Sequence, residues 1–197
     1  MAARDRRLEV GSAALDLSGQ TDEQLAVEAK REGSDGPAFR ELLSRHRDRV
    51  WHVCYRLMGN ESDASDAAQE VFVRLFLNRA KFEGRSKYST WVHGVAVRTC
   101  LTLRRSRGRR AKHETVVETQ PEKTSGQIES QAAASRIDLM QMLDVLSEED
   151  RAMLILKHAE NYSYEELAEM FDLSESACKM RLSRARERLK KQFPNPM

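Results

Sequence analysis

The chain has 197 residues, of which 40% are hydrophobic and 32% charged, and its formal net charge is +2. A chain of this length forms one large domain or two small ones. The N-terminus lacks the apolar core of a secretory signal, and no apolar run approaches the roughly 20 residues of a membrane span, so we expect a cytoplasmic protein without membrane insertion. The three cysteines show no CxxC spacing, and we interpret Cys54, Cys100 and Cys178 as small buried hydrophobes rather than disulfide partners or zinc ligands.

Residues 1–19 form a polar tail of mixed charge, which we expect to be disordered. Structure is predicted to begin at Thr21, where the sequence TDEQ matches a capping box between Thr21 and Gln24. A short helix follows, and after a break at residues 33–37 a second helix carries a wide apolar stripe to Gly59. His46 on that stripe is interpreted as a core or boundary histidine, because no second metal ligand lies at a suitable spacing.

A third helix is predicted after the start signal at residues 60–62. Its apolar side chains face inward and leave Asp66, Gln69 and Glu70 on the outer face. Asp66 and Glu70 are one turn apart, but no histidine or further carboxylate completes a metal site, so we expect neither a metal nor a cofactor. The outer face is predicted to hold dipole-stabilising surface acids or to dock a protein.

The stretch from Arg85 to Lys112 is rich in lysine and arginine and contains no acid. It begins in a charged loop over residues 78–89 and continues as a helix predicted from Thr90. Aromatic rings beside these cations form a combination that stacks unpaired bases along a phosphate backbone. Trp91 also lies on the apolar stripe, so we favour a structural role for it and keep Tyr88 and the arginines as the ligand candidates.

Residues 113–135 are polar and are predicted to be a flexible linker between domains spanning residues 20–112 and 136–193. Beyond the linker, Ser147 is the expected N-cap of a helix. The first turn of that helix holds three acids at residues 148–150, where the helix dipole favours negative charge.

The segment from Tyr164 to Lys191 predicts two helices joined by a corner at residues 172–174, which is the outline of a helix-turn-helix. Ser174 suits the N-cap of the second helix. That helix directs an apolar stripe inward and a basic face outward, and its shortage of acids favours DNA contact over a solvated charged face. The sequence therefore predicts an all-α fold of two small helical domains joined by a flexible linker, the C-terminal one a helix-turn-helix.

In the order and spacing of three motifs, the chain resembles the extracytoplasmic-function (ECF) group of bacterial sigma factors, the promoter-recognition subunits of RNA polymerase. The motifs are DASDAAQEVFVRLF at residues 63–76, STWVHGVA at residues 89–96 with the arginine run after it, and the segment from Leu146 to Leu189. The resemblance implies a region-2 domain that docks on the polymerase clamp and opens the minus-10 element. It also implies a region-4 domain that recognises the minus-35 element as duplex.

The resemblance assigns residues to three kinds of contact, none of them catalytic. Asp66, Gln69 and Glu70 are assigned to polymerase docking. The residues assigned to recognition and melting of the minus-10 element are Arg85, Lys87, Tyr88, Trp91, Arg98, Arg104 and Arg105. The residues assigned to recognition of the minus-35 element are Ser176, Lys179, Met180, Arg181, Ser183 and Arg184. The chain departs from the family at Arg98, where an asparagine is frequent, and at Thr102, where an acid is frequent.

The implied partners are core RNA polymerase, promoter DNA and an anti-sigma factor. Two domains on a flexible linker are expected to expose their polymerase and DNA faces when free, so that a partner clamping them together silences both. One alternative is a conventional helix-turn-helix regulator in which the N-terminal block is a sensing or dimerisation domain. The acidic face of Asp66 and Glu70 beside an acid-free basic helix argues against it, because a sensing domain needs neither feature. Another is a metal-dependent nuclease using Asp63, Asp66 and Glu70, which lacks a convincing ligand set.

Overall fold

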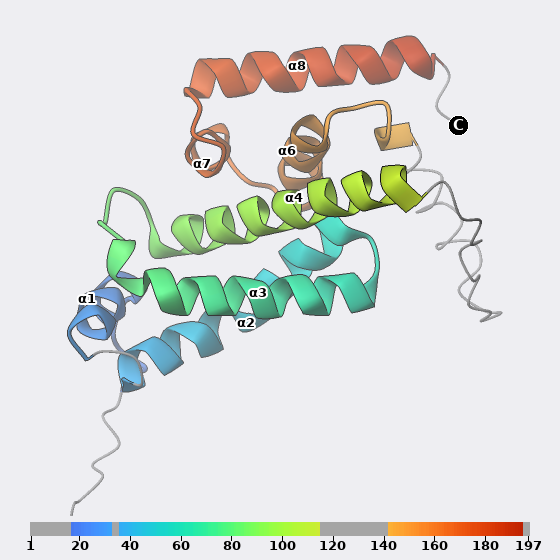
Figure 1. The fold of residues 1–197 in the computed structure, drawn as a ribbon. Helices are drawn as coiled ribbons and strands as arrows, with labels where there is room; N and C mark the ends of the chain where they lie inside the picture. The colour runs from blue at the N-terminus through green and yellow to red at the C-terminus, as the bar shows by residue number, and fades with distance from the viewer. Residues whose placement is uncertain (1–16, 33–35, 115–141, 195–197) are drawn as a thin grey trace, which may run out of the picture.

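The computed structural model describes residues 17–32, 36–114 and 142–194, and every regular element within these ranges is a helix (Figure 1). The elements are α1 Asp22–Glu32, α2 Pro37–Met58, α3 Glu61–Asn78, η1 Arg79–Lys81, α4 Tyr88–Glu114, α6 Glu148–Ala159, α7 Tyr164–Met170 and α8 Glu175–Gln192. The predicted all-α fold is thereby confirmed. Residues 1–16 of the predicted tail and 115–135 of the predicted linker lie outside the described residues.

Helix boundaries in the N-terminal domain follow from short-range hydrogen bonds. The predicted capping box is present before α1, since the N–H of Thr21 donates to Oε1 of Gln24 (2.8 Å) and the N–H of Gln24 donates to Oγ1 of Thr21 (3.3 Å). Helix α2 ends at Gly59, whose φ of 90° is a left-handed conformation that favours glycine. Asn60 then caps α3 by accepting a hydrogen bond from the N–H of Asp63 (2.9 Å).

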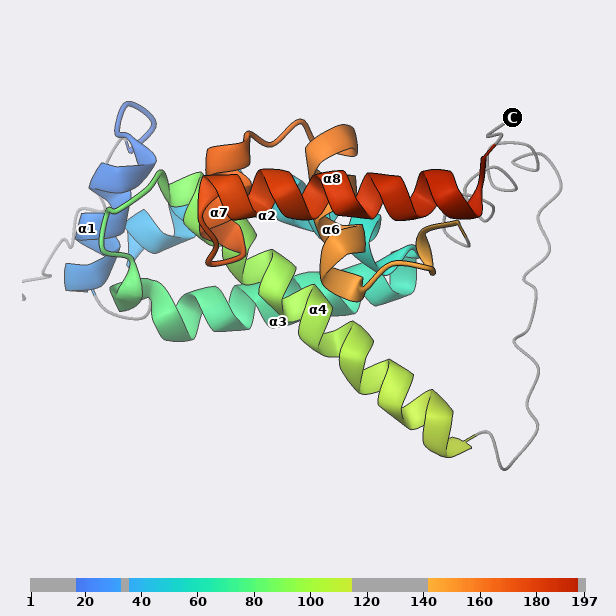
Figure 2. The same ribbon diagram turned by 90° about the horizontal axis from the view of Figure 1, so that it is seen from above.

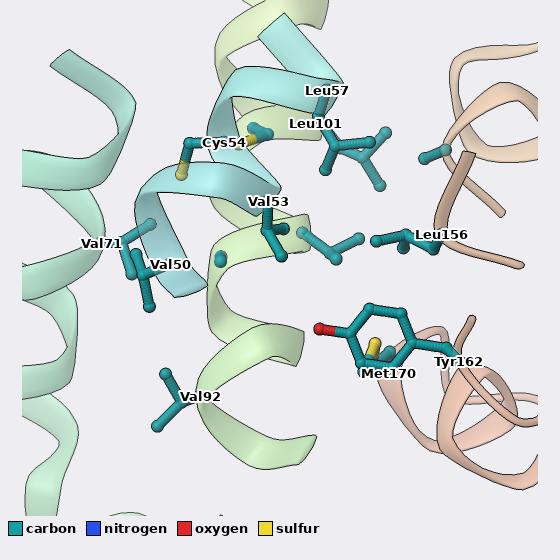
Figure 3. Packing of buried hydrophobic residues seen from close by; sticks show 14 of the residues in the cluster. Val50, Val53, Cys54, Leu57, Val71, Val92, Leu101, Leu156, Tyr162 and Met170 are labelled. Atoms are coloured by element: carbon teal, nitrogen blue, oxygen red, sulfur yellow. The ribbon is translucent and has the colours of Figure 1, made fainter. Parts of the chain in front are cut away.

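Helices α2, α3 and α4 pack side by side, and α1 lies across one end of them (Figure 1). Fully buried β-branched side chains such as Val50, Val71 and Val92 fill the space between them (Figure 3). All three cysteines are buried and free, which confirms their predicted role as small core residues. His46 is also buried, and its Nε2 lies 2.7 Å from Oδ2 of Asp22, so the predicted satisfied histidine is confirmed.

The start of α4 differs from the prediction. The helix begins at Tyr88, two residues before the expected Thr90, and the preceding loop contains the short helix η1. The N–H of Tyr88 donates to Oε1 of Glu23 in α1 (3.1 Å). This acceptor comes from 65 residues away, so the local sequence gives no sign of it.

Helices α6, α7 and α8 form the C-terminal domain, in which α7 and α8 make the predicted helix-turn-helix. Ser147 and Ser174 cap α6 and α8 as predicted, because each hydroxyl accepts a hydrogen bond from the backbone N–H three residues on. At the corner Asp172 adopts a φ of 55°, a left-handed conformation that aspartate tolerates. The N–H of Leu173 donates to the carbonyl of Ala168 (2.8 Å), which fixes the turn between the two helices.

The two domains pack against each other. Helices α6 and α7 lie between α4 and α8, and α6 also contacts α2 (Figures 1 and 2). The buried apolar residues form one continuous cluster across both domains, in which Leu156, Tyr162 and Met170 lie opposite Val53 and Leu101 (Figure 3). The two domains are therefore packed together through a shared apolar cluster, while the outer sides of α3 and α8 keep exposed residues.

Candidate nucleic-acid interface

The outer face of α3 remains uncovered by the C-terminal domain, since α3 packs against α2 and α4 on the side of the molecule away from α8 (Figure 1). Asp66 and Gln69 are exposed there, and Glu70 pairs with Arg74 of the same helix (2.8 Å). These side chains have the accessibility that a docking surface requires.

Sequence reasoning missed the apolar continuation of this face. Val73 is 53% exposed and Leu77 is 68% exposed. Asp66, Gln69, Val73 and Leu77 recur at three- and four-residue steps, so they lie on one side of α3. This spacing was the one signal in the sequence that could have revealed the apolar part of the surface. Polar residues next to large exposed apolar side chains are typical of a surface that binds another protein.

Tyr88 does not present a free ring. It is 2% exposed, and its ring packs against those of Phe82 (5.1 Å between centroids), Trp91 (5.5 Å) and His46 (5.5 Å). Burial raises the pKa of the Tyr88 hydroxyl, with a further contribution from the negative charge of Asp22. The sequence favoured a structural Trp91 and a ligand-binding Tyr88. The structure shows the reverse burial, because Tyr88 is a core residue and Trp91 is the partly exposed ring.

Several minus-10 candidates converge on a cavity of about 360 Å³ at the start of α4. Arg85, Trp91 and Arg98 contribute to its wall, and Glu169 and Met170 of α7 line it from the other domain. Its volume is within the usual range for a ligand pocket. Lys87 is exposed on the same loop, and Arg85 pairs with Glu83.

Arg98 is engaged between the domains. Its Nη1 donates to the carbonyl oxygen of Met170 at the end of α7 (3.1 Å). Burial lowers the pKa of Arg98, although the charges of Asp172 and Glu169 act in the opposite direction. Arg98 therefore forms part of the interdomain contact.

The first turn of α6, residues Glu148 to Asp150, binds arginines from both domains; we call it the α6 acidic turn. Glu148 accepts from Nε and Nη2 of Arg104, and Glu149 pairs with Arg105, both on α4. Arg181 of α8 donates to Glu149 (2.6 Å) and to Asp150 (2.5 Å).

These ion pairs change the interpretation of three predicted DNA ligands. Arg104 and Arg105 were expected to bind minus-10 DNA and Arg181 to bind minus-35 DNA, yet each is bound by the α6 acidic turn. Hydrogen bonding to Arg181 is the largest influence holding the pKa of Glu149 below its ordinary value. The carboxylates are thus charged partners of the guanidinium groups, not merely acids placed by the helix dipole.

The remaining minus-35 candidates lie on the open side of α8. Four of them are exposed: Ser176, Met180, Ser183 and Arg184. A shallow groove beside the corner is lined by Ser176, Met180 and Arg184, together with Arg181. Lys179 is also exposed and pairs with Glu175 one turn earlier (2.5 Å). The helix therefore presents a surface suited to a DNA groove.

Two parts of the sequence match family models of sigma factors. Residues 42–110 match Sigma-70 region 2, and residues 136–189 match Sigma-70 region 4. SigW, an ECF RNA polymerase sigma factor of Bacillus subtilis, is 29% identical over 173 residues, which span 81% of this chain and 90% of SigW. The chain belongs to the ECF sigma factor family.

Two solved structures share the fold of this sigma factor. One is the sigma factor RpoE in complex with the anti-sigma factor NepR from Bartonella quintana, with a TM-score of 0.58 and 23% identity over 81% of this chain and 98% of that one. The other is CnrH in complex with the cytosolic domain of CnrY, with a TM-score of 0.62 and 20% identity over 88% of this chain and 97% of that one. At these identities the likeness establishes the fold alone.

Two further properties of the sigma factor concern the part of the chain that the structure describes. No helix in that part is long and apolar enough to cross a membrane. Nor does it contain a group of three or more histidine, cysteine, aspartate or glutamate residues placed to hold a metal ion. Asp63 pairs with Arg107 and accepts from Nδ2 of Asn60 (2.9 Å), so its carboxylate is already engaged.

His93 lies at the centre of the interdomain contact in this sigma factor. Its Nδ1 is 2.7 Å from the hydroxyl of Tyr162, whose ring also lies under the guanidinium of Arg49. Burial lowers the pKa of His93 to about 3, and the charges of His46 and Arg49 lower it further. Arg49 in turn pairs with Glu160 (3.2 Å), so α2 and α4 both hold the segment before α7.

We expect the interdomain contact to weaken as the pH falls below about 6.5, the ordinary pKa of histidine. His93 is neutral when the domains are packed. Separation removes part of its burial and raises its pKa, although His46 and Arg49 of the same domain still lower it, so separation gains less than about tenfold for each pH unit below that value. The groups facing His93 are His46 and Arg49 from α2, Tyr162 from the segment before α7, and Asp22 behind His46.

The radius of gyration from small-angle X-ray scattering measures this effect as the pH is lowered from neutral to mildly acidic. His93→Gln keeps a hydrogen-bonding group without titration in this range, so its profile should be flatter than that of the parent. Identical pH profiles for the two proteins would contradict the role of His93.

Proposed function

We propose that this sigma factor uses α3 to dock on core RNA polymerase, the cavity at the start of α4 to capture unpaired minus-10 bases, and α8 to recognise the minus-35 duplex. As an alternative sigma factor, it directs the polymerase to specific promoters. The observation that carries the proposal is the presence of regions 2 and 4 in one chain, together with a docking face on α3 that stays open.

Strand opening requires a site that binds an unpaired base better than a paired one, because only differential affinity shifts the equilibrium. The cavity offers the partly exposed ring of Trp91 beside the guanidinium groups of Arg85 and Arg98. An aromatic face with nearby cations stacks a base and holds its phosphate. Tyr88 supports this site from beneath, because its buried ring packs against Trp91.

We expect Trp91→Ala to slow formation of the open promoter complex by about fivefold or more, since base–aromatic stacking contributes roughly 1 to 3 kcal/mol. Arg85→Ala should have a similar effect on strand capture. Permanganate reactivity of minus-10 thymines measures opening. Tyr88→Ala distinguishes base stacking from structural support of the site, because removing a buried ring should lower the melting temperature of the protein. Parental thymine reactivity in both Trp91→Ala and Arg85→Ala proteins would place strand capture elsewhere.

Duplex recognition requires side chains that a rigid helix carries into the major groove. Ser176, Met180 and Arg184 lie along the open side of α8 and are supplied by a helix that is capped at Ser174. Arginine can bind a guanine edge through two hydrogen bonds, whereas Lys179 supplies a point charge to a phosphate.

The partners of this sigma factor are core RNA polymerase, promoter DNA and an anti-sigma factor, and we place its action in the cytoplasm with the polymerase. We assign it no catalytic activity of its own. A conventional helix-turn-helix regulator would bind DNA without polymerase. Gel filtration of the purified protein with core polymerase distinguishes the two, because a sigma factor co-elutes with the core and a conventional regulator elutes separately.

A further inference from the structure

We propose that α1 positions the cavity that captures unpaired minus-10 bases, because its residue Glu23 acts as the N-cap of α4 from a distant part of the chain. Glu23 is a positioning residue in this role: it fixes the first turn of α4, at the end of which Trp91 reaches the cavity. The proposal rests on the proposed function, since it concerns how the strand-capture site is kept in shape.

The first turn of α4 is capped by a residue of another helix. Lys87, the residue before α4, has an ammonium group that donates hydrogen bonds and accepts none. Oε1 of Glu23 instead accepts a hydrogen bond from the N–H of Tyr88 (3.1 Å). Glu23 also lies in the first turn of α1. The positive ends of two helix dipoles therefore meet at one carboxylate.

Helix α2 holds this carboxylate in place. Arg45 of α2 donates to the carbonyl oxygen of Gln20 (2.7 Å), so it anchors the segment that leads into α1. Asp22, the neighbour of Glu23, binds Nη1 of Arg45 (3.1 Å) and Nε2 of His46 (2.7 Å). The start of α1 is thus fixed against α2, which holds Glu23 opposite the start of α4.

The capped turn forms part of the cavity wall. The ring of Tyr88 packs against those of Trp91 (5.5 Å between centroids) and Phe82 (5.1 Å), and both of these residues line the cavity. Thr90 of the same turn lines it as well. A hydrogen bond that fixes the backbone of Tyr88 therefore fixes the groups around a captured base. A site that is ordered in advance binds more tightly, because less conformational entropy is lost on binding.

Helix α1 carries a second cap of the same kind at its other end. Oε2 of Glu32 accepts a hydrogen bond from the N–H of Ala38 in the first turn of α2 (3.0 Å). Glu23 and Glu32 are both exposed, and each caps a helix other than its own. Loss of either should lower the melting temperature by about 2 to 4 °C, the shift expected for one cap in a chain of this size. Only Glu23 caps the helix that carries Trp91, so the two residues separate lost stability from lost positioning.

The test follows promoter opening by core polymerase reconstituted with full-length Glu23→Ala or Glu32→Ala, at a promoter that the parent protein opens. Time courses of permanganate reactivity at minus-10 thymines, taken at several polymerase concentrations, give the affinity of the closed complex and its rate of opening separately. We expect Glu23→Ala to slow opening about fivefold, the factor that corresponds to one helix cap, with unchanged affinity of the closed complex. Glu32→Ala should open the promoter at the parental rate.

The conservative variant Glu23→Gln tests the hydrogen bond itself. Its amide oxygen still accepts from the N–H of Tyr88, whereas the negative charge is lost, so opening should return to within about twofold of the parental rate. Glu23→Gln and Glu23→Ala change the net charge equally, so general attraction to DNA cannot distinguish them. Opening as slow in Glu23→Gln as in Glu23→Ala would overturn the capping role.

Hydrogen exchange of the free protein gives a second readout, without polymerase. The amides at the start of α4 should exchange about fivefold faster in Glu23→Ala and at the parental rate in Glu32→Ala. Equal opening rates for these two variants, or parental exchange at the start of α4 in Glu23→Ala, would overturn the proposal. Failure of polymerase with the parent protein to open any promoter would instead count against the proposed function.

Discussion

We expect Asp66→Arg/Glu70→Arg to abolish binding to core RNA polymerase while leaving the helical fold intact. Asp66 is exposed and Glu70 is paired only at the surface, with Arg74 of the same helix, so the double charge reversal costs little folding free energy. At a docking surface, however, each reversed charge faces a partner selected for the opposite sign, and juxtaposed like charges cost several kcal/mol. Co-purification with core polymerase measures binding, and circular dichroism monitors the fold.

The control for charge reversal is Asp48→Arg/Glu165→Arg, which changes the net charge equally at exposed acids on α2 and α7. This control should retain binding to core polymerase. Unchanged affinity of Asp66→Arg/Glu70→Arg for the core would remove α3 as the docking surface.

The second large effect is expected for Arg184→Ala on the minus-35 duplex. Arg184 is exposed and lines the groove beside the corner with Ser176 and Met180. If it binds a base edge through two hydrogen bonds, its loss should cost about 1 to 3 kcal/mol and relax specificity at one position. Lys190→Ala, at an exposed position near the end of α8, is the control and should leave sequence preference unchanged.

Anisotropy titrations against duplexes with single base changes in the minus-35 element measure both quantities. A uniform loss of affinity across all duplexes would assign Arg184 to a phosphate. Equal binding by Arg184→Ala and the parent would remove it from the interface.

Local patterns in the sequence predicted the helix caps and the inward stripes well, although not the start of α4. The caps at Thr21, Ser147 and Ser174 are confirmed because a cap depends on residues only three positions apart. The buried cysteines and the buried His46 are confirmed because a residue on an apolar helical stripe is buried in almost any packing.

Predictions that depended on which face meets which partner were less successful. Tyr162 and Met170 are buried in an apolar cluster that both domains share, and no local pattern in the sequence indicates that the other domain contributes to it. Arg104 and Glu148 are 44 residues apart, and no local rule pairs them across a linker. Tyr88 looked exposed in a charged loop, whereas tertiary contacts with Phe82 and His46 bury it.

The central claim, that this chain is a promoter-specific subunit of RNA polymerase, is tested most directly by run-off transcription of a genomic fragment library. Core polymerase is incubated with the library alone, with the parent protein, or with Asp66→Arg/Glu70→Arg. The account predicts discrete new transcripts only with the parent, starting downstream of a shared pair of sequence elements. A transcript pattern with the parent identical to that of core polymerase alone would contradict it.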